Sequence, residues 1–104
     1  MILDFTESAI RDLRAISKHT RTRWGSEQEI RYLKQLYARF QQILESPASY
    51  RFREDLFPDC QVAIEGRHQI LFQVKNDSLL VVRILHEKMS IERHFAKGRD
   101  DSDA

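Results

Sequence analysis

Apolar residues in the first part of the chain recur at the spacing of an amphipathic helix. Ala9, Leu13 and Ile16 are separated by four and three positions, which places them on one helical face. Thr6 precedes this stripe, and its hydroxyl is of the kind that caps the first free amides of a helix. The pattern predicts a helix that begins after Thr6 and ends at about His19.

A second and longer apolar stripe follows. The segment Ser26–Glu29 matches the S-x-x-E capping box, and Pro47 should end the helix at the preceding residue. Residues 20–25 lack the helical period, so they predict the connection, with Trp24 packed into the core beneath it. A connection this short predicts an antiparallel helical hairpin. The apolar positions of the second helix are Ile30, Leu33, Leu36, Tyr37, Phe40, Ile43 and Leu44.

After Pro47 the period changes from that of a helix to that of strands. Cys60–Ile64 and His68–Val74 alternate between apolar and polar residues, and Leu79–Leu85 is apolar except for Arg83, which is typical of a central strand covered on both faces. Met1–Phe5 reads as a brief opening strand. The predicted order is β-α-α-β-β-β: an α+β fold in which the helical hairpin packs on a small, mostly antiparallel sheet.

Length and composition limit the function classes. A chain of 104 residues fits one domain, which we place at residues 1–97, followed by a disordered acidic tail at 98–104 with three Asp residues. Seventeen Lys and Arg nearly balance sixteen Asp and Glu, so bulk polycation binding to DNA is not expected. One cysteine excludes an internal disulfide, and no motif indicates a metal or cofactor. Neither a secretory signal nor a membrane-spanning run is recognisable, so we expect a cytoplasmic protein.

The basic surface of the helical hairpin and the open edge of the sheet favour a binding function. Residues 11–39 hold eight basic and three acidic side chains, so the outer surface of the hairpin should be positive. Two amphipathic helices on a small sheet leave a groove and an open sheet edge, which a partner can fill. Alternatively, charged side chains protect the edge and the domain needs no partner.

Two residues of the last strand are candidates for chemistry. His86, followed by Glu87, lies at a strand end, where acid–base pairs often occur, although a His that only hydrogen-bonds a backbone group is the plainer reading. The segment lacks the second His of a zinc protease motif. Arg83 needs a partner, which is either a carboxylate of the chain such as Glu54 or Asp55, or an external anion or protein carboxylate. Strict alternation places Arg83 and His86 on opposite faces, so a shared site would need a bulge or strand end between them.

A second set of basic residues permits a nuclease hypothesis. Arg51, Arg53 and Arg67 could form a phosphate-binding cluster with His68, as a ribonuclease that uses no metal would need. The alternative is local pairing of Arg51 and Arg53 with the neighbouring Glu54 and Asp55 on a solvated surface.

Four stretches in order resemble the ParE branch of the RelE/ParE toxin superfamily, the toxin half of bacterial type II toxin–antitoxin modules. They are SAIRDLRAI at residues 8–16, Trp24-Gly25 followed by Tyr32, Leu33 and Leu36, the segment GRHQILF at 66–72, which is similar to G-x-H-x-I-F-Y, and VRILHEKM at 82–89, which is similar to R-V-L-H-x-x-M. The resemblance covers about residues 1–93.

The resemblance implies one of two actions. RelE-like proteins cleave messenger RNA in the ribosome, whereas ParE-like proteins inhibit DNA gyrase. Where the RelE branch has an Arg in the second meander strand and a basic residue after the last strand, this chain has Gln69 and Glu87. The RelE branch also commonly ends with a Tyr near the cleavage site, whereas no Tyr follows Tyr50 in this chain. The loss of two cations weakens a site that must stabilise an anionic transition state. The resemblance therefore favours a gyrase inhibitor that acts by binding and not as an enzyme.

The resemblance also implies the partners and their surfaces. A cognate, ParD-like antitoxin would lay its C-terminal helix in the groove and make the DNA contacts. Its expected contacts are Leu13, Ile16, Leu33, Leu36 and Phe40. The expected gyrase-binding segment contains Arg83, His86, Lys88, Met89 and Ile91. The alternatives are a RelE-type ribonuclease that uses His86 with Arg67, Arg53 and Arg51, or a non-toxic remnant that only binds its antitoxin.

Overall fold

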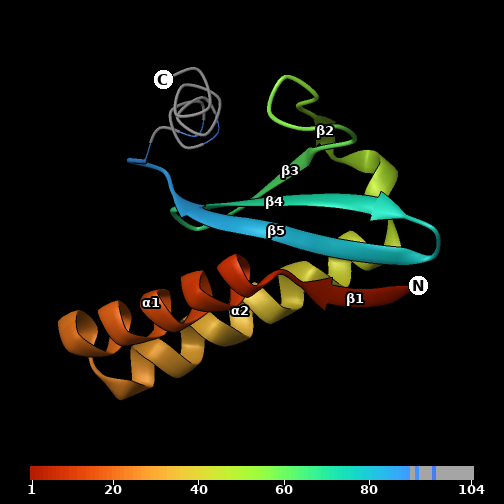
Figure 1. Cartoon of the computed structure of the whole chain (residues 1–104). Coiled ribbons are helices and arrows are strands. Elements are labelled where there is room, and N and C mark those ends of the chain that lie inside the picture. Colours follow the sequence, from red (N-terminus) through yellow and green to blue (C-terminus); the bar gives the residue numbers. More distant parts are fainter. Residues whose placement is uncertain (90, 92–94, 96–104) are drawn as a thin grey trace, which may run out of the picture.

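Two helices lie side by side against one face of a five-stranded sheet (Figure 1). The computed structural model describes residues 1–89, 91 and 95, so the predicted acidic tail lies outside the described residues. Along the chain the elements are β1 (Ile2–Phe5), α1 (Glu7–Trp24), α2 (Ser26–Glu45), the 3-10 helix η1 (Pro47–Ser49), β2 (Arg51–Phe52), β3 (Gln61–Glu65), β4 (His68–Lys75) and β5 (Ser78–His86).

The strand order is β1-β5-β4-β3-β2. β1 runs parallel to β5, and every other neighbouring pair is antiparallel. The predicted α+β class, helical hairpin and three-stranded meander are confirmed, and β5 occupies the predicted interior position. The additional strand β2 was predicted as loop because two residues are too few to show an alternating pattern.

Helix α1 begins as predicted but ends later. The Thr6 hydroxyl accepts a hydrogen bond from the Ala9 amide at 3.0 Å and donates one to the Val82 carbonyl at 2.7 Å, so the cap also fastens α1 to β5. The expected end near His19 is wrong. Nothing in the following segment opposes the helix, which continues until Gly25 adopts a positive φ of 95°.

The connection between the helices differs from the prediction in two further ways. Ser26 is already the first residue of α2 and makes no capping bond. The Glu29 carboxylate instead accepts hydrogen bonds from the Ser17 hydroxyl and from Arg21. Trp24 is 66% exposed and lies beneath the Arg23 guanidinium at 5.8 Å, because the tip of the hairpin extends beyond the sheet. The prediction of a core Trp24 is therefore wrong.

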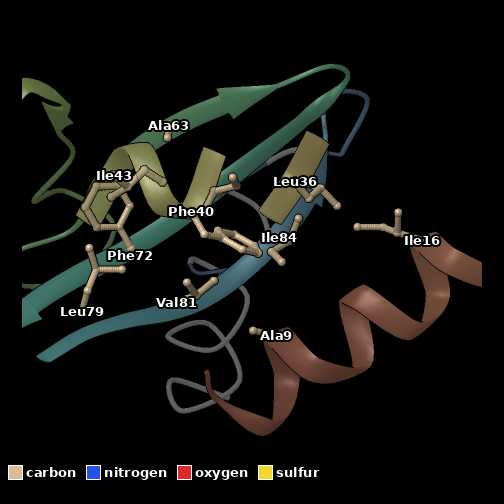
Figure 2. Close-up of a cluster of buried hydrophobic side chains, with 11 residues drawn as sticks. Ala9, Ile16, Leu36, Phe40, Ile43, Ala63, Phe72, Leu79, Val81 and Ile84 are labelled. Atoms are coloured by element: carbon tan, nitrogen blue, oxygen red, sulfur yellow. The ribbon is translucent and has the colours of Figure 1, made fainter. Parts of the chain in front are cut away.

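The larger core fills the space between the helices and the sheet. Figure 2 shows Ala9 and Ile16 of α1 directed toward Val81 and Ile84 of β5. A second cluster lies on the opposite face of the sheet, because its members alternate along the strands with those of the first. Its buried residues are Leu56, Cys60, Val62, Leu71, Leu85 and Ile91.

The pairing of β4 with β5 contains an irregularity. Phe72 is opposite Val81, but the preceding Leu71 is opposite Arg83, so Val82 is the extra residue of a bulge. Bulges redirect side chains and free backbone amides, and this one lies directly above the first turns of α1.

Among the described residues, neither helix is both long and apolar enough to cross a membrane.

Candidate functional site

A groove of about 670 Å³ opens between the two helices and β1. Four of the five residues predicted from the sequence line it, namely Leu13, Leu33, Leu36 and Phe40. The fifth, Ile16, does not, because it points into the core and is only 8% exposed. The remaining lining residues are Leu3, Phe5, Arg14, Ser17, Lys18, Arg21 and Tyr37.

The groove continues onto an open sheet edge. β1 pairs with β5 on one side only, and its other edge has no partner among the described residues. Leu3 and Phe5 face the groove, whereas Ile2 is 67% exposed. Sequence reasoning missed the contribution of β1 because its pairing with a strand more than 70 residues away leaves no local signal.

Arg83 finds its partner in an unexpected place. The Asp12 carboxylate of α1 accepts hydrogen bonds from Arg83 Nε at 2.8 Å and from its terminal nitrogen at 3.1 Å. The same carboxylate accepts a hydrogen bond from the Ile84 amide at 2.9 Å. The hydrogen bonds that Arg83 donates to the Asp12 carboxylate raise the pKa of the Arg83 guanidinium. The prediction of a carboxylate within the chain is confirmed. The named candidates, Glu54 and Asp55, are wrong because α1 lies directly against the bulge.

His86 belongs to a cluster that joins the sheet to α2. Its ring packs edge-on against the ring of His68, its cross-strand neighbour, with 5.3 Å between the ring centroids. The Tyr32 hydroxyl donates its proton to the Glu65 carbonyl at 2.8 Å, and its oxygen lies 2.6 Å from His68 Nδ1. His86 Nδ1 accepts the Lys88 amide at 3.1 Å. This bond confirms the plainer reading, in which His86 closes the strand by bonding a backbone group.

The expected alternation of Arg83 and His86 is confirmed in the strand register, where Arg83 is opposite Leu71 and His86 is opposite His68, but the two side chains do not end on opposite faces. Arg83 reaches Asp12 on α1, and His86 contacts His68, whose ring meets Tyr32 on α2. Both side chains therefore turn toward the helical layer, where each has a partner within the chain.

Burial sets the protonation of the cluster. Burial is the main cause that lowers the pKa of His68 from 6.5 to about 4, and the charges of His86 and His19 lower it further, while Glu87 and Asp12 oppose the shift. Burial, followed by the charge of Glu65, raises the pKa of Tyr32 to about 12. At neutral pH both side chains are therefore uncharged.

The neutral His68 predicts acid sensitivity. Because its folded pKa is lowered, the unfolded chain binds the proton more readily, and stability falls as the pH drops from 6.5 to about 4. We expect a loss of about 1–2 kcal/mol after allowing for solvent screening. Chemical unfolding across this pH range measures it. His68→Gln provides the control, since its decline should be shallower; equal declines would contradict the assignment to His68.

The four residues of the nuclease hypothesis do not converge. Arg53 forms two hydrogen bonds with Asp55 at 2.8 and 2.9 Å, as the local-pairing alternative predicted. Arg67 contacts Glu87 at 2.6 Å in the turn beside His86. Arg51 lies on the edge strand β2, three strand spacings or roughly 14 Å from β5.

The predicted target-binding segment is only partly exposed. Lys88 and Met89 are exposed, and Met89 is 48% accessible. Ile91 is 6% exposed and packs in the second core cluster. Arg83 and His86 have the internal partners described above. Within the described residues, no three His, Cys, Asp or Glu side chains are arranged to hold a metal ion.

Comparison with known proteins places the sequence in a family. The family model described as the ParE toxin of type II toxin–antitoxin systems, parDE, matches residues 3–91. Toxin ParE of Escherichia coli is 30% identical over 92 residues, covering 88% of this chain and 89% of that protein. Toxin ParE1 of Caulobacter vibrioides is 29% identical over 84 residues, covering 81% of this chain and 86% of that protein.

Solved structures share the fold. A chain of the chromosomal ParDE system of P. aeruginosa superposes with a TM-score of 0.70 and 20% identity, covering 83% of this chain and 95% of that chain. The isolated E. coli RelE toxin gives a TM-score of 0.60 and 22% identity, covering 95% and 97%. Because the ParE model spans most of the sequence and a ParE relative reaches 30% identity over 88% of it, this chain belongs to the ParE toxin family of type II toxin–antitoxin systems.

Proposed function

We propose that this protein is a toxin that inhibits DNA gyrase by binding it, and that a ParD-like antitoxin neutralises it. The observation that carries the choice of binding over catalysis is the dispersal of the candidate phosphate-binding groups. Arg53 and Arg67 are each paired with a carboxylate of the chain, and Arg51 lies on a distant strand. A phosphodiester transition state needs cations that point at one place.

The face of the sheet opposite the helices supports the same choice. Leu71 and Leu85 are fully buried there beneath Leu56 and Ile91. Gln69 is the cross-strand neighbour of Leu85 on this face, so an uncharged side chain occupies the place where the RelE branch has an Arg. Phosphate binding requires charged groups and access to water, and the apolar packing on this face provides neither.

The groove supports the antitoxin. It combines an apolar lining with the open edge of β1, so an antitoxin can bury an apolar helical face in the groove and add a separate extended segment with main-chain hydrogen bonds at the edge. We expect the antitoxin, and not this chain, to contact operator DNA. Since gyrase acts on chromosomal DNA, this function places the toxin in the cytoplasm.

For the target, we propose the segment that follows β5. Lys88 and Met89 present a charge and a flexible apolar side chain next to each other at the surface. This combination suits a protein–protein contact, since Met adapts to irregular surfaces. Arg83, His86 and Ile91 would then hold the segment in place rather than contact gyrase.

A supercoiling assay with purified gyrase tests the proposal. Excess toxin should block supercoiling, equimolar antitoxin should restore it, and the double variant Lys88→Ala, Met89→Ala should inhibit about tenfold more weakly. Lys75→Ala, at the opposite end of the β4–β5 hairpin, is the matched surface control. Unimpeded gyrase at excess toxin would refute the proposal.

Two parallel measurements separate the alternatives. Ribosome-dependent cleavage of messenger RNA that disappears in His86→Ala would favour the RelE-type ribonuclease. Normal growth after induction without antitoxin would favour the non-toxic remnant.

A further inference from the structure

The two helical walls of the groove differ in charge. The α1 wall presents Arg14, Lys18 and Arg21, whereas the lining residues of α2 are all apolar or aromatic, with Leu33 and Tyr37 nearest the opening. An occupant of this groove therefore meets cations on one side and an apolar surface on the other.

Two of the three cations are available to a partner. Arg21 already pairs with Glu29 at 3.0 Å. Arg14 and Lys18 are exposed and form no ion pair with any residue that the structure describes. They are four residues apart on α1, which places them on one face of the helix, about 6 Å apart along its axis.

These unpaired cations constrain what can lie in the groove. A purely apolar segment would remove water from both cations without replacing it, which costs free energy. A second copy of this chain would bring the same positive wall, and like charges repel. An occupant with carboxylates opposite Arg14 and Lys18 avoids both costs.

We propose that Arg14 and Lys18 select the partner: the groove takes an amphipathic helix with two acidic side chains one turn apart facing α1, and an apolar side facing Leu33 and Tyr37. This inference rests on the proposed function, in which the groove holds the antitoxin. The spacing of the cations matches acidic residues at positions i and i+4 of a helix. Charge pairs at a partly exposed wall contribute mainly to partner choice and to the rate of association.

Stapled helical peptides test the proposal against the full chain. Three peptides share one apolar face and carry a Glu pair, a Gln pair or a Lys pair at i and i+4. Fluorescence anisotropy measures their affinity for the unmodified chain and for the double variant Arg14→Glu, Lys18→Glu. Lys34→Glu is the matched control, since Lys34 is exposed on α2 but does not line the groove. Tyr37→Ala tests the apolar wall, and this side chain is 63% exposed, so the fold should tolerate its loss.

The expected result is a reversal of preference. The Glu peptide should bind the double variant on the order of tenfold to a hundredfold more weakly, and the Lys peptide should bind it more tightly than it binds the unmodified chain. Higher salt should weaken the binding of the Glu peptide alone to the unmodified chain, and the Lys34→Glu variant should bind the peptides as the unmodified chain does. Equal affinities of the three peptides would overturn the proposal. If a non-helical, proline-containing peptide of the same composition binds equally well, the inference that the bound segment is a helix is wrong.

The cognate antitoxin separates this inference from the proposed function. Antitoxin binding that is weakened by Tyr37→Ala but unchanged by the double charge reversal would overturn the selection by charge and leave the groove as the antitoxin site. Antitoxin binding unchanged by both would overturn the groove assignment itself.

Discussion

Replacing Asp12 with alanine will lower the free energy of unfolding by about 2–4 kcal/mol, because one carboxylate satisfies three donors. The substitution leaves the Arg83 guanidinium and the Ile84 amide without their acceptor at the bulge of β5. Only 15% of the Asp12 side chain is exposed, so water replaces it poorly. Thermal unfolding should show a loss of roughly 8–20 °C for a domain of this size.

The matched control for Asp12 is Asp55. It also pairs with an arginine through two hydrogen bonds, but it lies two residues from Arg53 and its side chain is 60% exposed. Asp55→Ala should change stability little, because exposed local pairs contribute little. Asp12→Asn should fall between the two, since an amide oxygen can still accept one donor. If Asp12→Ala and Asp55→Ala lower the free energy of unfolding equally, the contact at the bulge stabilises the fold no more than an exposed ion pair does.

Gly66→Ala will lower the free energy of unfolding by about 2–3 kcal/mol, for two separate reasons. Gly66 has a φ of 57°, which disfavours any side chain, and an added Cβ would lie 2.9 Å from the ring of Tyr32. Tyr32 cannot move aside without weakening its hydrogen bonds to the Glu65 carbonyl and to His68. Denaturant unfolding measures the loss.

A double-mutant cycle isolates the contact with Tyr32. Asn tolerates a positive φ but keeps its Cβ, so Gly66→Asn should remain destabilising. In a Tyr32→Ala background the contact is gone, and Gly66→Ala should cost only the backbone strain, about 1–2 kcal/mol. If Gly66→Ala costs the same in both backgrounds, the close approach of Tyr32 to the turn contributes nothing.

Local periodicity was sufficient to predict most of the architecture. Both helices, the meander and the interior position of β5 follow from the spacing of apolar residues, because each pattern lies within one element. The end of α1 was missed because no breaker precedes Gly25 and helices continue until something stops them. Trp24 was misplaced because periodicity cannot show that a helix extends beyond the sheet it covers.

The candidate site was predicted less completely, and the reason is distance along the chain. Leu13 and Leu36 were found because they belong to helical stripes. The Asp12–Arg83 pair joins residues 71 positions apart, and the Tyr32–His68 contact joins residues 36 apart. Ile16 shares the stripe of Leu13 but lies deeper, and a stripe alone does not separate a core residue from one that lines a groove.

The parallel pairing of β1 with β5 also affects when the fold can be completed during synthesis. Among the residues that the structure describes, the one strand partner of Ile2–Phe5 is Ser78–His86, which is synthesised more than 70 residues later. The hairpin of α1 and α2 is therefore synthesised before the sheet that it covers, and the core can close only after β5 has left the ribosome. The groove, to which β1 supplies Leu3 and Phe5, is thus complete only once β5 has been made, so a partner can bind the finished groove only after that point.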